Sequence, residues 1–447
     1  MNQLYAGFSR VNVTPMLGIG MAGYFKPRYA EGVLDELEIN AVALACGDDK
    51  ALLMSIDHCG IVKEVLNPMR EHISQATGLP LEAIYIHSTH THTGPFLNAD
   101  PTEELEIEYA RFVDRRFTAA AVMALADLKP AKMGYGMGTA PNIAFVRRFR
   151  MKDGSVRTNP GVDNPDILAP IGDVDERVNV VRIDQEGGES LVLVNFGNHP
   201  DVVGGNLISA DWPGFLRKTV ETTLEGTKCI FFNGAQGDVN HVNVHPRGGY
   251  LNDMFMDFDD VARGYKHARY MGRVVAGGVL QAYDKVKFVD VDKLSFGMKT
   301  ICVPSNKPDA SEMEEAHRIN DLHVAGRDDL LPYKGMMLTT MVAAAGRKVR
   351  LENGPDYFEM PLSALAIGPV AFIGIPGEPF TGVGRGLKET EGWEMVLPTC
   401  NTNAKEGYFP MNECYVEGGY EAGSSKFKAG VAELLIEEGK SLLGELK

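Results

Sequence analysis

The sequence lacks the features that mark disulfide-rich, zinc-finger and membrane-spanning proteins. It has six cysteines in 447 residues and no Cys-x-x-Cys pair, so neither a disulfide framework nor a cysteine zinc site is predicted. No run of about 18 apolar residues is present, which argues against stable membrane insertion. Residues 1–10 contain no basic region followed by an apolar stretch, so no export signal is expected. We therefore expect a cytoplasmic protein with reduced thiols.

The sequence also has no excess of basic over acidic residues. Lysine and arginine together number 44 against 60 aspartates and glutamates, which gives a formal net charge of −16. Non-specific binding to nucleic acid or to anionic membranes needs a basic face. The composition therefore predicts no nucleic-acid partner.

Short apolar runs alternate with amphipathic stretches, which is the pattern of an α/β fold. Hydrophobic residues make up 44% of the chain, enough for a large core. Apolar runs predict strands at 41–45, 51–56, 83–86 and 191–195, and a pair joined at Gly368-Pro369 within 362–375. Helical spacing of apolar residues predicts helices at 103–128, 265–283, 311–324 and 428–443. We expect mixed β-sheets covered by helices.

The sequence contains no internal repeat, low-complexity tract or long linker, which favours one continuous domain over residues 1–447. The charged passage at 285–293 suggests an alternative division into a larger lobe, 1–288, and a smaller lobe, 289–447. In that alternative both lobes contribute to a shared site.

Three histidines follow the predicted strand 83–86, namely His87, His90 and His92. Functional side chains are often carried at strand ends, where a rigid element holds them within reach of a ligand. Side chains two positions apart on an extended segment point to the same side, so His90 and His92 are expected to share a face. Such a pair suits one imidazole that binds a metal and one that transfers a proton. For His87 we expect a supporting hydrogen-bond role.

A catalytic zinc has three or four protein ligands and keeps a position for water, so ligands from distant segments are needed. His199 follows the predicted strand 191–195, and Glu378 follows the apolar run 371–375 and a glycine turn. An alternative for Glu378 is an acid at a helix N-terminus, because a helix can begin after Pro379. The metal-ligand candidates are His90, His199 and Glu378.

Four separated motifs resemble, in the same order, those of the neutral/alkaline (non-lysosomal) ceramidase family. They are residues 87–95, 195–200, 375–378 and 408–423, with further similarity at 6–15 and 237–240. The likeness covers most of the chain and implies the catalytic-domain fold of that family. The family carries a C-terminal immunoglobulin-like domain, whereas this sequence ends with a predicted helix soon after Tyr420, so it resembles a short bacterial-type member.

The resemblance implies one zinc ion as cofactor, held by His90, His199, Glu378 and Tyr408. Tyrosine is an unusual zinc ligand, and a tyrosine in Gly-Tyr-Phe-Pro is ordinarily a packed aromatic. The assignment of Tyr408 therefore depends on the likeness and on its spacing to Tyr420.

The resemblance also implies three catalytic residues: His92 as general acid/base, Tyr420 at the substrate carbonyl and Arg147 as an added electrophilic contact. The family's Asn-Arg-Ser element is replaced here by Val146-Arg147-Arg148, so Arg148 is an alternative to Arg147.

The implied activity is that of a zinc-dependent amidohydrolase, in which activated water attacks an acyl carbonyl. The expected partner is a small-molecule amide or ester. A cytoplasmic enzyme without the extra domain has little access to sphingolipid, so a soluble amide, ester or lactone is as well supported as ceramide. On this interpretation residues 1–447 form a single zinc-hydrolase catalytic domain, whose oligomeric state the sequence does not indicate.

Two other classes of function remain. A two-metal metallophosphoesterase is suggested by Gly197-Asn198-His199 and by Gly172-Asp-Val-Asp175, but Asp57-His58 lacks the intervening residue of the Asp-x-His motif. A non-catalytic binding protein with the same fold is the second alternative. Asp238 could hold a second ion, although a polar turn is the expected role for its segment.

Overall fold

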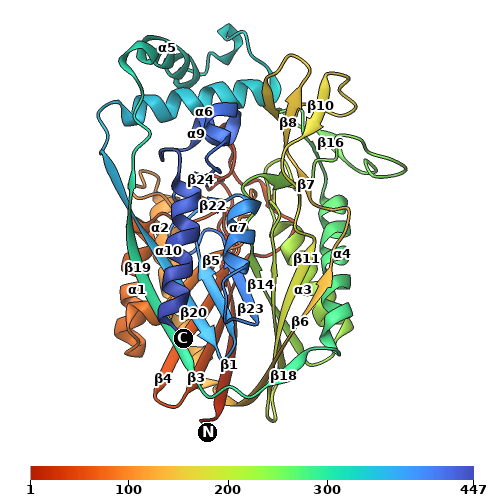
Figure 1. Cartoon of the computed structure of the whole chain (residues 1–447), viewed down its shortest axis with the longest axis vertical. Coiled ribbons are helices and arrows are strands. Elements are labelled where there is room, and N and C mark those ends of the chain that lie inside the picture. The colour runs from red at the N-terminus through yellow and green to blue at the C-terminus, as the bar shows by residue number, and fades with distance from the viewer. Residues whose placement is uncertain (1) are drawn as a thin grey trace.

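The computed structural model describes residues 2–447, and its centre is a nine-stranded mixed sheet (Figure 1). The strand order is β14-β12-β11-β6-β1-β3-β4-β5, and β18 pairs with β6 beside that path. Neighbours run antiparallel except for the parallel pairs β4/β5 and β12/β14. The strands are β1 (Leu4–Asn12), β3 (Glu38–Cys46), β4 (Asp49–Ile56), β5 (Ile84–Ser88), β6 (Lys129–Thr139), β11 (Arg177–Gln185), β12 (Ser190–Phe196), β14 (Thr227–Asn233) and β18 (Lys287–Val289).

A second, four-stranded sheet follows in the order β19-β20-β21-β23. Its strands are β19 (Leu294–Pro304), β20 (Tyr357–Ile367), β21 (Val370–Gly374) and β23 (Met395–Thr399). The predicted turn at Gly368-Pro369 is confirmed, and Gly368 adopts a φ of 53° there. The two sheets share one hydrophobic core, in which the Phe372 ring lies 5.3 Å from Phe232 and 6.3 Å from Tyr85. The charged passage at 285–293 contains β18, which belongs to the first sheet.

Helices cover the outer faces of both sheets. On the first sheet, α2 (Glu104–Ala126) lies over β1 and β3 beside α1 (Lys63–Thr77), and α3 (Asp211–Thr223) packs against α4 (Tyr265–Tyr283). On the second sheet lie α7 (Thr381–Lys388) and α10 (Val431–Glu445). A pair formed by α5 (Met313–Val324) and α6 (Gly335–Glu352) covers α9 (Tyr420–Ser424) at the top of Figure 1. Across residues 2–447, none of the helices combines the length and apolar character that crossing a bilayer requires.

All four predicted helices are confirmed, as α2, α4, α5 and α10, and α7 begins after Pro379, where the sequence allowed a helix, whereas α1, α3 and α6 were not predicted. The close approach of α4 to the first sheet depends on glycine. A Cβ at Gly138 of β6 would lie 1.9 Å from the Gly278 carbonyl oxygen, so no larger residue allows α4 this position.

The loops that surround the upper end of the sheets contain short strand pairs and turns. They are β2 (Gly32–Val33) with β13 (Leu207–Ile208), β7 (Phe145–Val146) with β15 (Val239–Asn240), β8 (Arg148–Met151) with β9 (Val156–Thr158) and β10 (Ile167–Pro170), β16 (Phe255–Met256) with β17 (Ala262–Arg263), and β22 (Glu378–Pro379) with β24 (Tyr408–Phe409). The remaining elements are α8 (Cys414–Glu417) and the 3₁₀ turns Leu81–Ala83, Ala310–Glu312 and Asp328–Leu330.

A buried ion pair holds the upper end of β4. The Asp57 carboxylate accepts hydrogen bonds from Arg217 at 2.9 and 2.6 Å, and its two oxygens also accept bonds from Thr89 Oγ1 and the Glu38 amide. Asp57 and Arg217 are 1% and 4% exposed. Removal of one partner from such a pair leaves an uncompensated buried charge.

We expect Asp57→Asn to lower the free energy of unfolding by about 3 kcal/mol, measured by chemical denaturation. The matched control is Glu315→Gln, which breaks the exposed pair between Glu315 and Arg318 and is expected to leave the unfolding midpoint unchanged. Equal midpoints for the two variants would contradict this account.

Candidate metal centre and active site

Three buried side chains converge where strands of both sheets end. Glu378 Oε2 lies 3.2 Å from His90 Nε2 and 3.2 Å from His199 Nε2. The three ligand atoms lie within 4.8 Å of one another, so the group could hold a metal ion. His90 follows β5, His199 follows β12, and Glu378 is the first residue of β22 after β21. The three metal-ligand candidates named from the sequence are therefore neighbours in space.

The second nitrogen of each histidine has a backbone partner. His90 Nδ1 donates to the Cys59 carbonyl at 2.6 Å, and His199 Nδ1 donates to the carbonyl of Gln236 at 2.8 Å. These bonds keep a proton on each Nδ1 and leave the Nε2 atoms facing the shared point, where a bound metal would take their lone pairs. A backbone carbonyl in this role is the usual support for a metal-binding histidine. The donor set therefore fits a divalent metal.

The charges of the group also require a cation. Burial would raise the pKa of Glu378, but His90 and His199 hold that pKa well below its usual range. Burial would likewise lower the pKa of His90, but Glu378 and Cys59 raise it to about 10. Burial and Arg147 lower the pKa of His199. The carboxylate is thus ionised and is balanced by a proton on His90, in the place where a metal ion would supply the charge.

Close packing at a glycine brings Glu378 and Tyr408 together. β22 and β24 pair in parallel with Glu378 opposite Tyr408. A Cβ at Gly377 would lie 2.5 Å from the Gly407 carbonyl oxygen, so glycine is required before Glu378. Glu378 begins a strand, and the helix expected after Pro379 is present as α7, which begins at Thr381 with Phe380 as its N-cap, so Glu378 lies outside the first turn of that helix.

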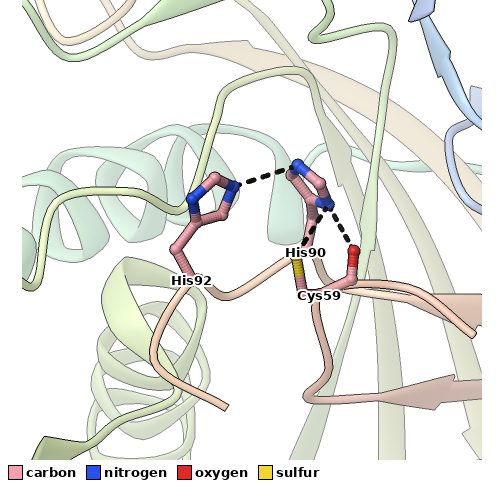
Figure 2. Close-up of side chains that lie close together, drawn as sticks. All are labelled: Cys59, His90 and His92. Atoms are coloured by element: carbon pink, nitrogen blue, oxygen red, sulfur yellow. Dashed lines mark hydrogen bonds between the residues drawn. The ribbon is translucent and has the colours of Figure 1, made fainter. Parts of the chain in front are cut away.

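His90 and His92 face one another, but the geometry expected from the sequence is wrong. β5 ends at Ser88, so the two histidines are not on an extended strand, and His90 has a φ of 77°. That left-handed conformation is uncommon outside glycine and is held by the surrounding structure. Figure 2 shows the two rings turned toward each other, with Nε2 atoms 3.2 Å apart and the Cys59 carbonyl beyond the His90 ring.

His92 is the more accessible of the pair, with a side chain 11% exposed against 2% for His90. Burial lowers the pKa of His92 well below its usual value, so the imidazole is neutral and can accept a proton. Its Nδ1 lies 3.5 Å from Asp201 Oδ1. Asp201 is held in turn by Arg263 at 2.9 Å and by the Tyr24 hydroxyl at 3.0 Å.

Arg147 lies against the histidine and carboxylate group, and Arg148 does not. Arg147 Nη1 is 3.4 Å from His199 Nε2, and its guanidinium is fixed by Glu421 at 2.7 Å and by the Gly237 carbonyl at 2.6 Å. Arg148 instead contacts Cys414, Glu417 and Gly418.

The two tyrosines form the wall beside Arg147. The rings of Tyr408 and Tyr420 lie 5.5 Å apart, and the Arg147 guanidinium is 5.3 and 5.9 Å from their centres. Burial and Glu378 raise the pKa of both hydroxyls. All seven residues named from the sequence, including Arg147 rather than Arg148, are therefore brought together.

His87 lies outside this group. Its Nε2 accepts a hydrogen bond from the Asn233 amide at 2.9 Å, and its Nδ1 is 3.2 Å from Ser55 Oγ. Burial and the charge of His90 lower its pKa to about 3. His87 therefore links β5 to β4 and β14, in agreement with the supporting role expected for it.

Three further residues of the site were not indicated by the sequence, namely Glu421, Asp201 and Cys59. Each of them contacts a partner that is distant in the sequence. Glu421 is fully buried against Arg147, and Asp201 faces His92. Cys59 forms a second possible metal-binding group with His90 and His92. Because His90 belongs to both groups, a metal ion can use only one of them at a time. Burial would raise the pKa of Cys59, but Lys405, at 3.5 Å, and His90 lower it to about 7. The only local signal was the polar run that follows each strand.

The acidic residues that suggested a phosphoesterase or a second ion have other partners. Asp57 binds Arg217, and Asp175 binds Arg177 at 2.7 Å and Lys388 at 2.8 Å. Asp238 accepts hydrogen bonds from the amide and hydroxyl of Thr381 at 2.7 and 2.9 Å, where α7 begins. None of these carboxylates joins either metal group found in residues 2–447.

Comparison with known proteins identifies the fold. No family model matches the sequence, and no curated protein matches it either. The structure is similar to that of neutral ceramidase from Pseudomonas aeruginosa, with a TM-score of 0.73 and 17% identity over 100% of this chain and 75% of that chain. A structure described as ceramidase complexed with C2 matches with a TM-score of 0.72 and 17% identity, over 100% of this chain and 76% of the other. The expected α/β fold of a neutral ceramidase catalytic domain is confirmed.

Proposed function

We propose that the protein is a zinc-dependent hydrolase that cleaves an acyl bond, with an amide as the first candidate and an ester or lactone as further ones. The observation that carries the proposal is the convergence of His90, His199 and Glu378 beside His92, in a fold shared with a neutral ceramidase. The ligands come from both 1–288 and 289–447, as expected for one continuous domain and equally for two lobes that share a site.

His90, His199 and Glu378 would hold the zinc ion, with Tyr408 as a fourth ligand. Two imidazole nitrogens and a carboxylate oxygen are a donor set typical of catalytic zinc. When bound, zinc supplies a Lewis acid and lowers the pKa of water toward 7. The Cys59 and Gln236 carbonyls keep the two histidines in the tautomer that this binding needs.

His92 would move the proton. Its neutral imidazole accepts a proton from the attacking water and returns it to the leaving nitrogen or oxygen. The negative charge of Asp201, 3.5 Å from His92 Nδ1, would favour the tautomer that is protonated on Nδ1 and would leave Nε2 free to act as base. His92 is more exposed than the buried pair His90 and His199, which suits a group that must reach substrate.

Arg147 and Tyr420 would stabilise the negative charge that develops on the substrate carbonyl oxygen. Arg147 is fixed by Glu421 and the Gly237 carbonyl, so it needs no reorganisation during the reaction. The raised pKa of Tyr420 keeps its hydroxyl protonated and able to donate. Loss of one such donor raises the barrier by about 3 kcal/mol in well-studied cases.

An apolar cavity beside the site would receive the acyl group. It has a volume of about 650 Å³, and Phe25, Phe258, Val324, Leu338 and Val342 supply apolar wall, while Lys26, His323, Asp328 and Asp329 also line it. The Phe25 ring lies 6.3 Å from that of Tyr420, so the cavity adjoins the tyrosine proposed to contact the carbonyl. The substrate expected on this basis has an apolar acyl part next to the scissile bond.

The test is hydrolysis by metal-quantified protein of a panel of N-acyl amides, esters and lactones, with short-chain ceramide included. We expect one zinc per chain and acyl hydrolysis that a chelator removes and zinc restores. Turnover of aryl phosphates with two metals per chain would replace the proposal with a phosphoesterase. A chain that binds no metal would favour a non-catalytic binding protein.

Asp201→Asn is expected to lower kcat by about 10- to 100-fold without changing KM or zinc content, because the His92 tautomer is then no longer selected. Arg263 keeps Asp259 as a partner at 2.6 Å, so the fold should persist. Steady-state kinetics and zinc analysis check this result. A rise in KM with kcat intact would show that Asp201 serves substrate binding instead.

A further inference from the structure

A second cavity, outside the site, is surrounded by basic residues. It has a volume of about 470 Å³ and is lined by residues from 247–253 and from the first half of α4, the helix on the right of Figure 1. Its cations are Arg247, Lys266, Arg269 and Arg273, and Asp253 is the acid among its lining residues. No residue of the candidate active site lines it.

Two of these four cations have acidic partners in the protein, and two do not. Lys266 pairs with Asp253 at 2.9 Å, and Arg247 lies 3.7 Å from Asp163. Arg269 and Arg273 take part in none of the ion pairs found within residues 2–447, and they lie four positions apart on α4, where like charges repel. In a chain whose net charge is −16, two arginines without an acidic partner on the same helix face leave a local positive charge that suits an anion.

A buried histidine supplies an independent indication of a ligand. His267 lines the cavity, is only 4% exposed, and has an Nε2 atom with no hydrogen-bond partner within residues 2–447. Burial lowers its pKa to about 4, so the ring is neutral and can donate or accept a hydrogen bond. A buried polar atom without a partner is rare in folded proteins and indicates a missing water, ion or ligand.

Aromatic rings form the remaining wall. The ring of Tyr250 lies 4.8 Å from that of His267, and the ring of Tyr270 lies 5.5 Å from it. Guanidinium groups bind phosphate oxygens in a two-pronged geometry, and aromatic faces accept planar rings. The cavity therefore combines groups for a phosphate with a surface for an aromatic ring.

We propose that this cavity binds a phosphate monoester of a small aromatic molecule, with a nucleoside monophosphate as the fitting chemical class. Arg269 and Arg273 contact the phosphate, and His267, Tyr250 and Tyr270 hold the ring. The site is separate from the proposed hydrolytic centre and does not depend on its activity.

Calorimetric titration of the full chain with adenosine 5′-monophosphate, inorganic phosphate and adenosine tests the proposal. We expect the monophosphate to bind once per chain, inorganic phosphate to bind more weakly and adenosine not to bind. The double variant R269A/R273A should weaken monophosphate binding by at least about ten-fold. The control R318A/K440A removes the same charge from α5 and α10, outside the cavity, and should change binding less than about two-fold.

Two further measurements test the role of His267 and distinguish a nucleotide from a lipid headgroup as the source of the phosphate. His267→Phe keeps the ring and removes Nε2, and should weaken binding while the melting temperature without ligand shows that the fold is intact. Vesicles of phosphatidylcholine with phosphatidate test a lipid source of the same phosphate: binding to these vesicles but not to the nucleotide would keep the anion site and reassign its ligand to a lipid headgroup. If R269A/R273A bound the monophosphate as tightly as the unaltered chain does, the proposal would be overturned. That result is expected for phosphate held at the group of His90, His199 and Glu378. Equal affinity for adenosine, or no binding of any phosphate, would also overturn the proposal.

Discussion

His92→Ala is expected to lower kcat for acyl hydrolysis by about 10²- to 10⁴-fold, the usual contribution of a positioned general acid/base. The Nε2 of His92 faces His90 at 3.2 Å, while the Nδ1 of His90 is bonded to Cys59, so His92 can be lost without removing a support of the metal group. Zinc content should therefore stay at one per chain. Single-turnover kinetics on metal-quantified protein measures both quantities.

A matched control for this variant is His72→Ala. His72 is an exposed histidine on α1 that pairs with Asp114 at 2.9 Å, and its loss should leave kcat unchanged. Retention of most activity by His92→Ala would show that proton transfer is performed by another group. Loss of zinc by the same variant would instead show that His92 is a ligand.

Glu378→Gln is expected to remove zinc and activity together. The carboxylate is the only anionic member of the group and contacts both histidines, so its neutral amide cannot balance a divalent charge. Zinc affinity should fall by more than about 100-fold, which exceeds the usual effect of losing a supporting residue outside the ligand set. Competition with a chelator of known affinity measures the change.

Cys59→Ser separates the two possible metal groups. Cys59 belongs to the alternative group with His90 and His92, and its backbone carbonyl, which bonds His90, is retained in the serine variant. We expect Cys59→Ser to keep its zinc. Loss of zinc in Cys59→Ser combined with retention in Glu378→Gln would assign the metal to the alternative group.

Helices and strands whose apolar residues recur at a regular spacing were predictable from the sequence. The helix predicted at 265–283 has the bounds of α4, and the apolar runs in 362–375 are β20 and β21 around the Gly368 turn. α3 was missed because Asp211-Trp-Pro-Gly214 has the composition of a turn, and α6 because it begins with glycine. In α3 burial against neighbouring elements outweighs the weak local propensity, whereas α6 is rich in good helix formers after its first residue.

The candidate ligands His90, His199 and Glu378 were also predictable, because each follows an apolar strand, whereas Tyr408 was indicated only by the family resemblance. The residues that support these ligands were not predictable. Asp201 differs little in local sequence from other surface aspartates, and its role depends on Arg263 and Tyr24, which come from distant segments. The choice between Arg147 and Arg148 depends on Glu421, which lies 274 positions along the chain from Arg147.

The sequence by itself determined that this is an acidic α/β protein with histidines and a glutamate at strand ends, because hydrophobic periodicity and residue type are local properties. Only the tertiary structure decided how those residues meet. The left-handed turn at His90 places its ring opposite His92 without an extended strand, and the approach of β22 to β24 sets Glu378 beside Tyr408. Such contacts depend on the packing of one sheet on the other, which brings residues hundreds of positions apart within hydrogen-bond distance and which no local pattern specifies.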